Sequence, residues 1–196
     1  MVSFYDPDEV TAKKRVDRKA ALERRQKRRE WAASLTGDAA VSAAKEAALK
    51  QLDRQDRSRG ELTAKLRERG FNDEPIAAAL DRLEEAGLVN DERYARMLVR
   101  TRHAERGLVG RALVEQLRRK QIPSEIIELA MEEVEGESME DLARDIVQRK
   151  AGGMLGLSRD KQIRRLTSML ARKGYPPGVC YSVVNSVLSE LEDDEY

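Results

Sequence analysis

The chain has 196 residues, of which 40% are hydrophobic, 4% aromatic and 37% charged, with a formal net charge of +1. So few aromatic residues make one large core less favourable than an elongated assembly whose units each bury a modest aliphatic stripe. Alternating β-branched runs are missing and Ala, Leu, Glu, Arg and Lys dominate, so we predict an all-α protein. A single cysteine excludes an internal disulfide, and a single histidine leaves few ligands for a His and Cys metal site.

The chain shows no pattern typical of a membrane or secreted protein. No run approaches the roughly 20 apolar residues that cross a bilayer, and the first ten residues are acidic where a secretion signal would be basic and then apolar. We therefore expect a cytoplasmic protein with no membrane partner.

Residues 1–38 form a basic extension. Residues 11–30 hold ten Lys or Arg and three acidic residues, with few apolar residues to fix them on a core. This composition is typical of a disordered arm or of a lone exposed helix that starts at "DPDE". Attraction to nucleic acid and simple solubilisation explain it about equally well. Trp31, the only tryptophan, is the residue that we expect to dock the extension on the next unit.

Beyond the extension an apolar pattern recurs three times, 51 residues apart from Phe71 to Ile122 and 53 apart from Ile122 to Tyr175. Positions nine and five before each anchor, and five, nine and twelve after it, are apolar in every copy. They are Leu62, Leu66, Ile76, Leu80 and Leu83; Leu113, Leu117, Ile127, Met131 and Val134; Leu166, Leu170, Cys180, Val184 and Val187. These offsets match helix faces, with the anchor at a turn between two helices.

A third helical stretch precedes each pair, so we predict an elongated array of three tandem three-helix repeats. The repeats span residues 39–90, 91–137 and 138–192. Ser138 is the expected cap at the start of the third repeat.

The turns carry the expected helix stops. At the anchors, Gly70 and Gly174 can close a helix with positive φ, whereas Gln121 replaces glycine in the second copy and weakens that closure. At the joint between repeats one and two, Gly87 ends a helix and Leu88 is expected to make the closing hydrophobic contact. Asn90 or Asp91 then caps the next helix.

Three stretches of the chain have a recognisable pattern: "SRGELTAKLRERGF", "LDRLEEAGLVNDERYARMLV" and "RGLVGRALVEQLRRKQI". In these stretches the chain resembles the RecX family, bacterial regulators that bind and inhibit the RecA recombinase filament. The resemblance covers about residues 45 to 190 and implies tandem three-helix repeats and RecA as the partner. It carries no role for the extension.

The small net charge hides strong blocks. Residues 92–122 hold nine Lys or Arg against three acidic residues, a net charge of +6, and residues 146–175 hold eight against one, +7. Residues 123–145 hold one against nine, −8, and the tail from residue 176 carries −5. Neighbouring opposite blocks can simply pair with each other. The functional alternative is a basic face on repeats two and three that binds phosphates or an acidic protein groove.

On the functional interpretation, the filament- or DNA-facing residues are the basic residues of repeats two and three. They are Arg96, Arg100, Arg102, Arg106, Arg111, Arg118, Arg119, Lys120, Arg164, Arg165, Arg172 and Lys173.

The helical repeat and the basic faces predict a monomeric, non-enzymatic binding protein. The resemblance implies that it is a regulator that lies along the RecA filament and its single-stranded DNA, and inhibits strand exchange, ATP turnover or filament growth. The alternative is a sequence-independent DNA-binding helical module with no protein partner. An enzyme is disfavoured because no convergent nucleophile, phosphate loop or metal set is present, and Cys180 and His103 are expected to be structural or exposed. We expect no catalytic residue, cofactor or metal.

Overall fold

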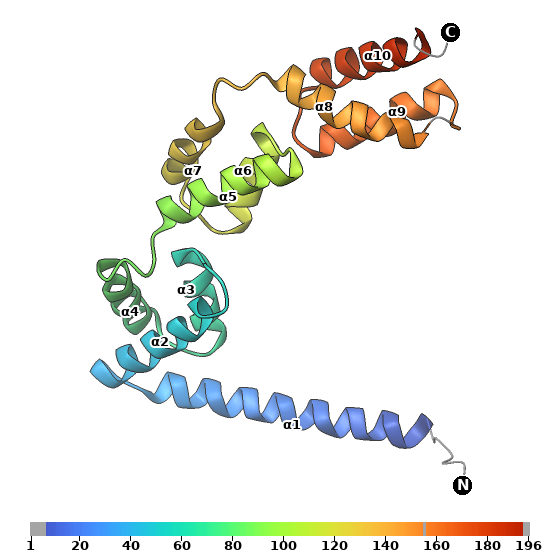
Figure 1. The fold of residues 1–196 in the computed structure, drawn as a ribbon. Helices are drawn as coiled ribbons and strands as arrows, with labels where there is room; N and C mark the ends of the chain where they lie inside the picture. The colour runs from blue at the N-terminus through green and yellow to red at the C-terminus, as the bar shows by residue number, and fades with distance from the viewer. Residues whose placement is uncertain (1–6, 155, 194–196) are drawn as a thin grey trace. The chain divides into compact units, whose positions relative to one another are not determined.

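The computed structural model describes residues 7–154 and 156–193, which form ten α-helices, two 3₁₀ turns and no strand (Figure 1). The all-α prediction with tandem three-helix repeats is confirmed. The chain divides after Asn90 into two compact units.

The N-terminal unit contains four helices. They are α1 (Pro7–Ser34), α2 (Gly37–Leu52), α3 (Arg59–Glu68) and α4 (Asp73–Glu85). The last three form repeat 1, whose core includes Leu62, Leu66 and Leu80. α1 joins this core through Ala32, which is 3% exposed. Trp31, the residue expected to dock the extension, is 56% exposed, and the buried contact of α1 with this core is made by its neighbour Ala32.

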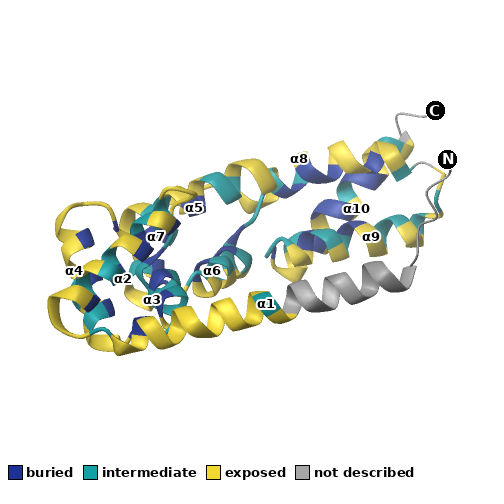
Figure 2. Cartoon of the chain, turned by 90° about the horizontal axis from the view of Figure 1, so that it is seen from below, coloured by how far each residue is buried: buried dark blue, intermediate teal, exposed yellow. Residues whose placement is uncertain are grey.

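The C-terminal unit contains six helices and both 3₁₀ turns. Repeat 2 consists of α5 (Asp91–Arg106), α6 (Gly110–Arg119), α7 (Ser124–Met131) and the turn Glu132–Val134; repeat 3 consists of α8 (Met139–Ala151), the turn Gly152–Met154, α9 (Arg159–Arg172) and α10 (Pro177–Asp193). Each repeat buries its own apolar cluster (Figure 2). Val109, from the loop between α5 and α6, belongs to the core of repeat 3, so the two repeats share a packed junction.

Sixteen of the eighteen repeated positions are buried, and the two exceptions, Met131 and Val134, are partly buried at the edge of the repeat 2 core. Both exceptions follow from the length of α7, which has 8 residues where α4 has 13 and α10 has 17. α7 ends at Met131, and Val134 falls in the 3₁₀ turn that follows. Ala130 is buried beside them.

The same closure ends the second helix of each repeat. The anchor N–H donates to the carbonyl five residues earlier, at 3.2 Å from Phe71 to Leu66 and 3.3 Å from Ile122 to Leu117 and from Tyr175 to Leu170. The residue before each anchor is left-handed: φ is +97° at Gly70, +55° at Gln121 and +99° at Gly174. This is the Schellman motif, in which the hydrophobic residue after the left-handed one packs back on the helix. The apolar residue five positions before each anchor is therefore the partner in that contact.

The joint between repeats 1 and 2 begins with the same kind of closure. Gly87 has φ of +69°, and the N–H of Leu88 donates to the Leu83 carbonyl at 2.9 Å. Leu88 is nevertheless 50% exposed while Val89 is 2% exposed, so the predicted hydrophobic contact is made one residue later. The N–H of Val89 also points to the Leu83 carbonyl, at 3.3 Å, which holds its side chain against the core.

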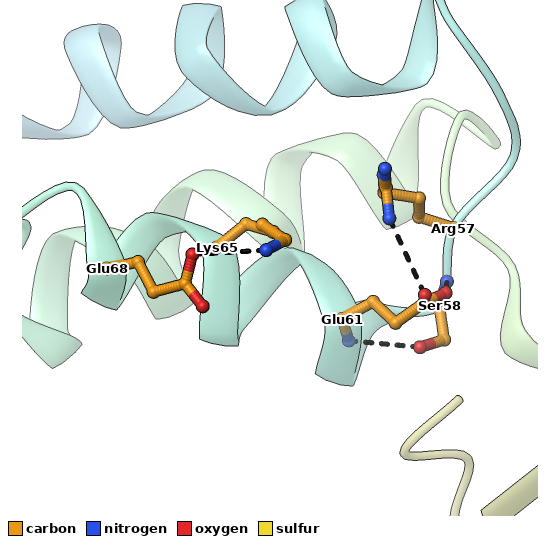
Figure 3. A network of polar contacts seen from close by, with 5 residues as sticks. All are labelled: Arg57, Ser58, Glu61, Lys65 and Glu68. Atoms are coloured by element: carbon orange, nitrogen blue, oxygen red, sulfur yellow. Dashed lines mark hydrogen bonds and ion pairs between the residues drawn. The ribbon is translucent and has the colours of Figure 1, made fainter. Parts of the chain in front are cut away.

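Serine side chains cap the starts of α3 and α8. Ser58 and Glu61 form a reciprocal capping box at α3: the Ser58 Oγ accepts from the Glu61 N–H at 3.0 Å, and the Glu61 carboxylate lies 3.4 Å from the Ser58 nitrogen (Figure 3). Arg57 Nη1 lies 3.5 Å from the same carboxylate. At α8, the Ser138 Oγ accepts from the Asp141 N–H at 3.2 Å, as the sequence predicts.

Candidate nucleic-acid interface

The first predicted cations, on α5, lie against the acidic 3₁₀ turn of the same repeat. Arg96 Nη2 lies 2.7 Å from Glu92 Oε1 and its Nη1 3.4 Å from Glu133 Oε1. Arg100 Nε lies 3.8 Å from Glu133 Oε2. At this place the opposite charge blocks pair with each other, which reduces the charge available to a ligand.

The two predicted cations nearer the C-terminal end of α5 form no ion pair with a carboxylate among the described residues. Arg102 is half-buried, and its Nε is buried with no hydrogen-bond partner among the described residues. Arg106, at the end of the helix, is exposed.

The predicted cations of α6 and α9 are mostly exposed. Arg111 pairs with Glu115 at 3.4 Å, and Arg172 donates to the Ser168 hydroxyl at 2.8 Å. Lys120 is half-buried at the C-cap of α6. The remaining four have no ion pair within the described part of the chain. They are Arg118, Arg119, Arg164 and Arg165.

Lys173 lies near three other cations of the C-terminal unit. Its ammonium donates to the Arg106 carbonyl oxygen and is half-buried. Burial lowers the pKa of Lys173, and the nearby charges of Lys150, Arg149 and Arg106 lower it further. We name these four residues the junction cluster: Arg106, Arg149, Lys150 and Lys173. No carboxylate forms an ion pair with any of their side chains in the residues that the structure describes.

The junction between the repeats brings these helix ends together. The Val109 N–H donates to the Lys173 carbonyl at 2.9 Å, and the Val109 side chain enters the repeat 3 core. Gly107 has φ of +59°, and a Cβ there would lie 2.6 Å from the Ile146 Cδ1. At Gly174 a Cβ would overlap the Val109 carbonyl oxygen. The cluster thus gathers where α5, α8 and α9 end, and helix C-termini favour cations.

Sequence reasoning named Arg106 and Lys173 but missed Arg149 and Lys150. Both stand in the basic block 146–175, which is the only sequence signal for them. Their proximity to Arg106 depends on the docking of the α5–α6 loop, which spacing along the chain does not reveal.

The other chemically versatile side chains are engaged in the structure. The two ring nitrogens of His103 each lie 3.0 Å from an oxygen, of the Leu108 carbonyl and of the Glu137 carboxylate. Cys180 is buried with its thiol 3.5 Å from the Tyr175 carbonyl, and burial raises its pKa. The described residues contain no group of three or more His, Cys, Asp or Glu placed to hold a metal ion. None of the helices, over the residues described, has the length and apolarity to cross a membrane.

Comparison with known proteins gives the family. Residues 44–83, 90–131 and 137–184 match the models of the first, second and third three-helix domains of RecX. The chain is 41% identical over 154 residues to the regulatory protein RecX of Streptomyces coelicolor (strain ATCC BAA-471 / A3(2) / M145), covering 79% of this chain and 82% of that protein. It is 40% identical over 134 residues to the regulatory protein RecX of Amycolatopsis mediterranei (strain U-32), covering 68% and 77%.

A solved structure shares the fold. The crystal structure of RecX from Lactobacillus salivarius superposes with a TM-score of 0.64 at 22% identity, covering 75% of this chain and 96% of that one. With three matching domain models and relatives of about 40% identity over most of its length, the chain belongs to the RecX family.

Proposed function

We propose that this protein regulates the RecA recombinase by binding the RecA–DNA filament, and that it inhibits strand exchange, ATP turnover or filament growth without catalysing a reaction. Membership of a family of regulatory proteins supports the regulatory role, and the resemblance supplies the partner. The junction cluster is the observation that carries the proposed contact with DNA.

The junction cluster has the chemistry of a phosphate site. Burial lowers the pKa of Lys173, and the charges of the other three cations lower it further, without a carboxylate among the described residues to balance them. A phosphate oxygen would relieve this repulsion and form charge-assisted hydrogen bonds with the guanidinium groups. Such contacts do not read bases, which suits a protein that acts along a filament of any sequence.

The exposed arginines of α6 and α9 extend the same surface chemistry. Arg118, Arg119, Arg164 and Arg165 are free of internal ion pairs in the described structure. Arg96, Arg100 and Arg111 already face carboxylates, so we assign them a smaller share of the binding. We propose that the protein acts as a cytoplasmic monomer, with single-stranded DNA inside the filament as the phosphate donor and with no cofactor.

The competing function is a sequence-independent DNA-binding module with no protein partner. Binding to bare single-stranded DNA and to a RecA filament on the same DNA, measured at one salt concentration, separates the two. We expect affinity for the filament to be higher by about tenfold or more. Equal affinities would favour the module and contradict the RecA-specific proposal.

Charge reversal tests the surface. Arg106→Glu, Arg149→Glu and Lys150→Glu in one chain should abolish filament binding, because three phosphate contacts become repulsive. Stability should fall by no more than about 1–2 kcal/mol, since the change replaces favourable charges at helix C-termini. Circular dichroism and filament co-sedimentation measure the two effects separately.

The matched control reverses the acidic block. Glu128→Lys, Glu132→Lys and Glu135→Lys change three exposed side chains by the same number of charges in the opposite sense. On this proposal they preserve or strengthen binding to the DNA-bearing filament. Loss of binding in this variant with retention in the first would indicate docking on a basic protein surface.

The non-enzymatic part of the proposal has its own support. The only histidine and the only cysteine are both held in structural contacts, at His103 and Cys180. Burial keeps Cys180 in the thiol form, which is a poor nucleophile. We expect the protein alone to release no phosphate from ATP, and turnover by the purified chain would contradict this part.

A further inference from the structure

A groove of about 650 Å³ lies in the N-terminal unit between α1, α2 and α3. α1 is fixed beside it by the buried Ala32 and by the backbone of Arg29. That backbone passes so close to Gly70 that a Cβ there would lie 2.5 Å from the Arg29 carbonyl oxygen. The groove is therefore preformed, and α1 lies outside the three segments that match the RecX domain models.

One wall of the groove is an arginine face of α1. Arg25, Arg28 and Arg29 line it, and their spacing of three and four residues puts them on one side of the helix. No carboxylate pairs with them among the residues whose positions are described. Arg69, at the end of α3, lines the groove as a fourth arginine without such a partner.

The two glutamates of the groove do not balance these arginines. Glu68 lies 3.1 Å from Lys65, with which it pairs on α3 (Figure 3). Glu46 lies 3.9 Å from Lys50 on α2. All four of these residues line the groove, so their charges cancel in pairs and the arginines leave it with a net positive charge.

Trp31 adds a flat aromatic surface to the same groove. It lines the groove while 56% of its surface is exposed, so its ring is available to a ligand. An exposed aromatic ring beside arginines is what single-stranded nucleic acid requires, since a base stacks on the ring and the phosphates contact the cations. A duplex offers no free base face, and an acidic peptide uses the charge without the ring.

We propose that this groove binds single-stranded nucleic acid, with a base stacked on Trp31 and phosphates held by Arg25, Arg28, Arg29 and Arg69. The volume suits a short nucleotide segment, because small-ligand pockets span about 300–1,000 Å³. The site is separate from the junction cluster and does not rest on the regulatory function proposed above.

Trp31 is the only tryptophan, so its fluorescence reports directly on the groove. Titration of the full chain with a short oligothymidylate, without RecA, should quench the emission to saturation, and added salt should weaken binding. The variant Arg25→Glu with Arg29→Glu should lower the affinity by about tenfold or more. α1 should stay docked, since its contacts are the Arg29 backbone and the Ala32 side chain.

The matched control is Lys27→Glu with Arg54→Glu, which makes the same change in net charge on exposed residues of the same unit that do not line the groove. It should lower the affinity by less than about threefold, as a screened long-range effect. Trp31→Ala should weaken binding of a labelled oligonucleotide by about tenfold, and Trp31→Phe should restore most of the loss, because stacking needs only an aromatic face.

Three results would overturn the proposal. They are an absence of quenching, an equal loss of affinity in the groove variant and its control, and equal quenching by a poly-glutamate peptide of matched charge. The last result would assign the groove to an acidic protein ligand. The junction cluster variant should still show quenching, so failure of the proposed function and failure of this site give different results.

Discussion

The turns at Gly174 and Gln121 close equivalent helices with the same hydrogen bonds, yet tolerate different residues. Both are left-handed, with φ of +99° and +55°. At Gly174 a Cβ would overlap the Val109 carbonyl and lie 2.9 Å from the Ala112 nitrogen, whereas Gln121 carries a full, exposed side chain. The conformation alone therefore does not demand glycine; close approach of another backbone does. Gly70 is the same case in repeat 1, with α1 as the approaching backbone.

The largest effect should come from the residue that both turns share, the buried leucine five positions before the anchor. Leu170→Asp and Leu117→Asp should each cost several kcal/mol, because an unpaired charge enters a fully buried site. Thermal unfolding followed by circular dichroism measures this. Leu129→Asp, at an exposed position of α7, is the control and should change stability little. Parental stability in the first two variants would refute the equivalence of the turns.

Alanine should have different effects on stability at the two turns, because it adds a Cβ at Gly174 but not at Gln121. Gly174→Ala should destabilise the protein by about 3 kcal/mol, from left-handed strain of about 1–2 kcal/mol and overpacking of about 1–3 kcal/mol. Gln121→Ala keeps an existing Cβ and should stay within about 0.5 kcal/mol of the parent. Urea denaturation compares them, and equal losses would show that close approach is not the reason for the glycine.

The anchor residues Tyr175 and Ile122 give the two turns a different dependence of stability on pH in alkaline solution. Burial raises the pKa of Tyr175 from 10.0 to about 12, whereas Ile122 does not titrate. The folded state favours the neutral phenol more than the unfolded state does. The contribution of Tyr175 to the free energy of unfolding is therefore complete below pH 10 and is lost as the pH rises towards 12. Denaturation between pH 9 and about 11.5 should show the loss, and Tyr175→Phe should remove its tyrosine-dependent part.

The same substitution has an expected effect at neutral pH. The Tyr175 hydroxyl is buried with no hydrogen-bond partner in the described structure. Tyr175→Phe should therefore leave stability unchanged or raise it by about 1 kcal/mol, because the unpaired polar group is removed. A clear loss of stability would indicate a partner for the hydroxyl.

The smallest effect is expected from restoring glycine to the second turn. Gln121→Gly relieves left-handed strain of about 1–2 kcal/mol but adds chain entropy of about 0.5–1 kcal/mol. A net gain of about 0.5 kcal/mol should raise the denaturation midpoint slightly. A fall in the midpoint would show that the Gln121 side chain stabilises the turn.

The repeat could be predicted because each copy places the same apolar residues at the same distances from its anchor. Met131 and Val134 depart from it because α7 is short, and no offset encodes where a helix stops early. Trp31, the only tryptophan, is the expected docking residue of the extension, whereas the buried contact of α1 is made by Ala32 and its backbone lies close to Gly70.

The candidate site was less predictable because it depends on contacts between elements. Arg96 and Arg100 form a basic row in the sequence, but Glu133 from the end of repeat 2 lies against both. Arg149 and Lys150 join Arg106 only through the junction that Val109 makes. Charge blocks therefore locate the basic region, while the neutralised and free residues within it emerge only from the fold.

The insertion of Val109 affects how the C-terminal unit unfolds and which fragments of it can fold. Val109 of repeat 2 completes the core of repeat 3. This contact couples the stabilities of repeats 2 and 3, as between nearest neighbours in a one-dimensional array of repeats. The pair should unfold in a single cooperative transition, without a plateau in which one repeat is intact and the other lost. A fragment that begins at Ser138 would lack the Val109 side chain, and one that ends at Glu137 would leave that side chain in water.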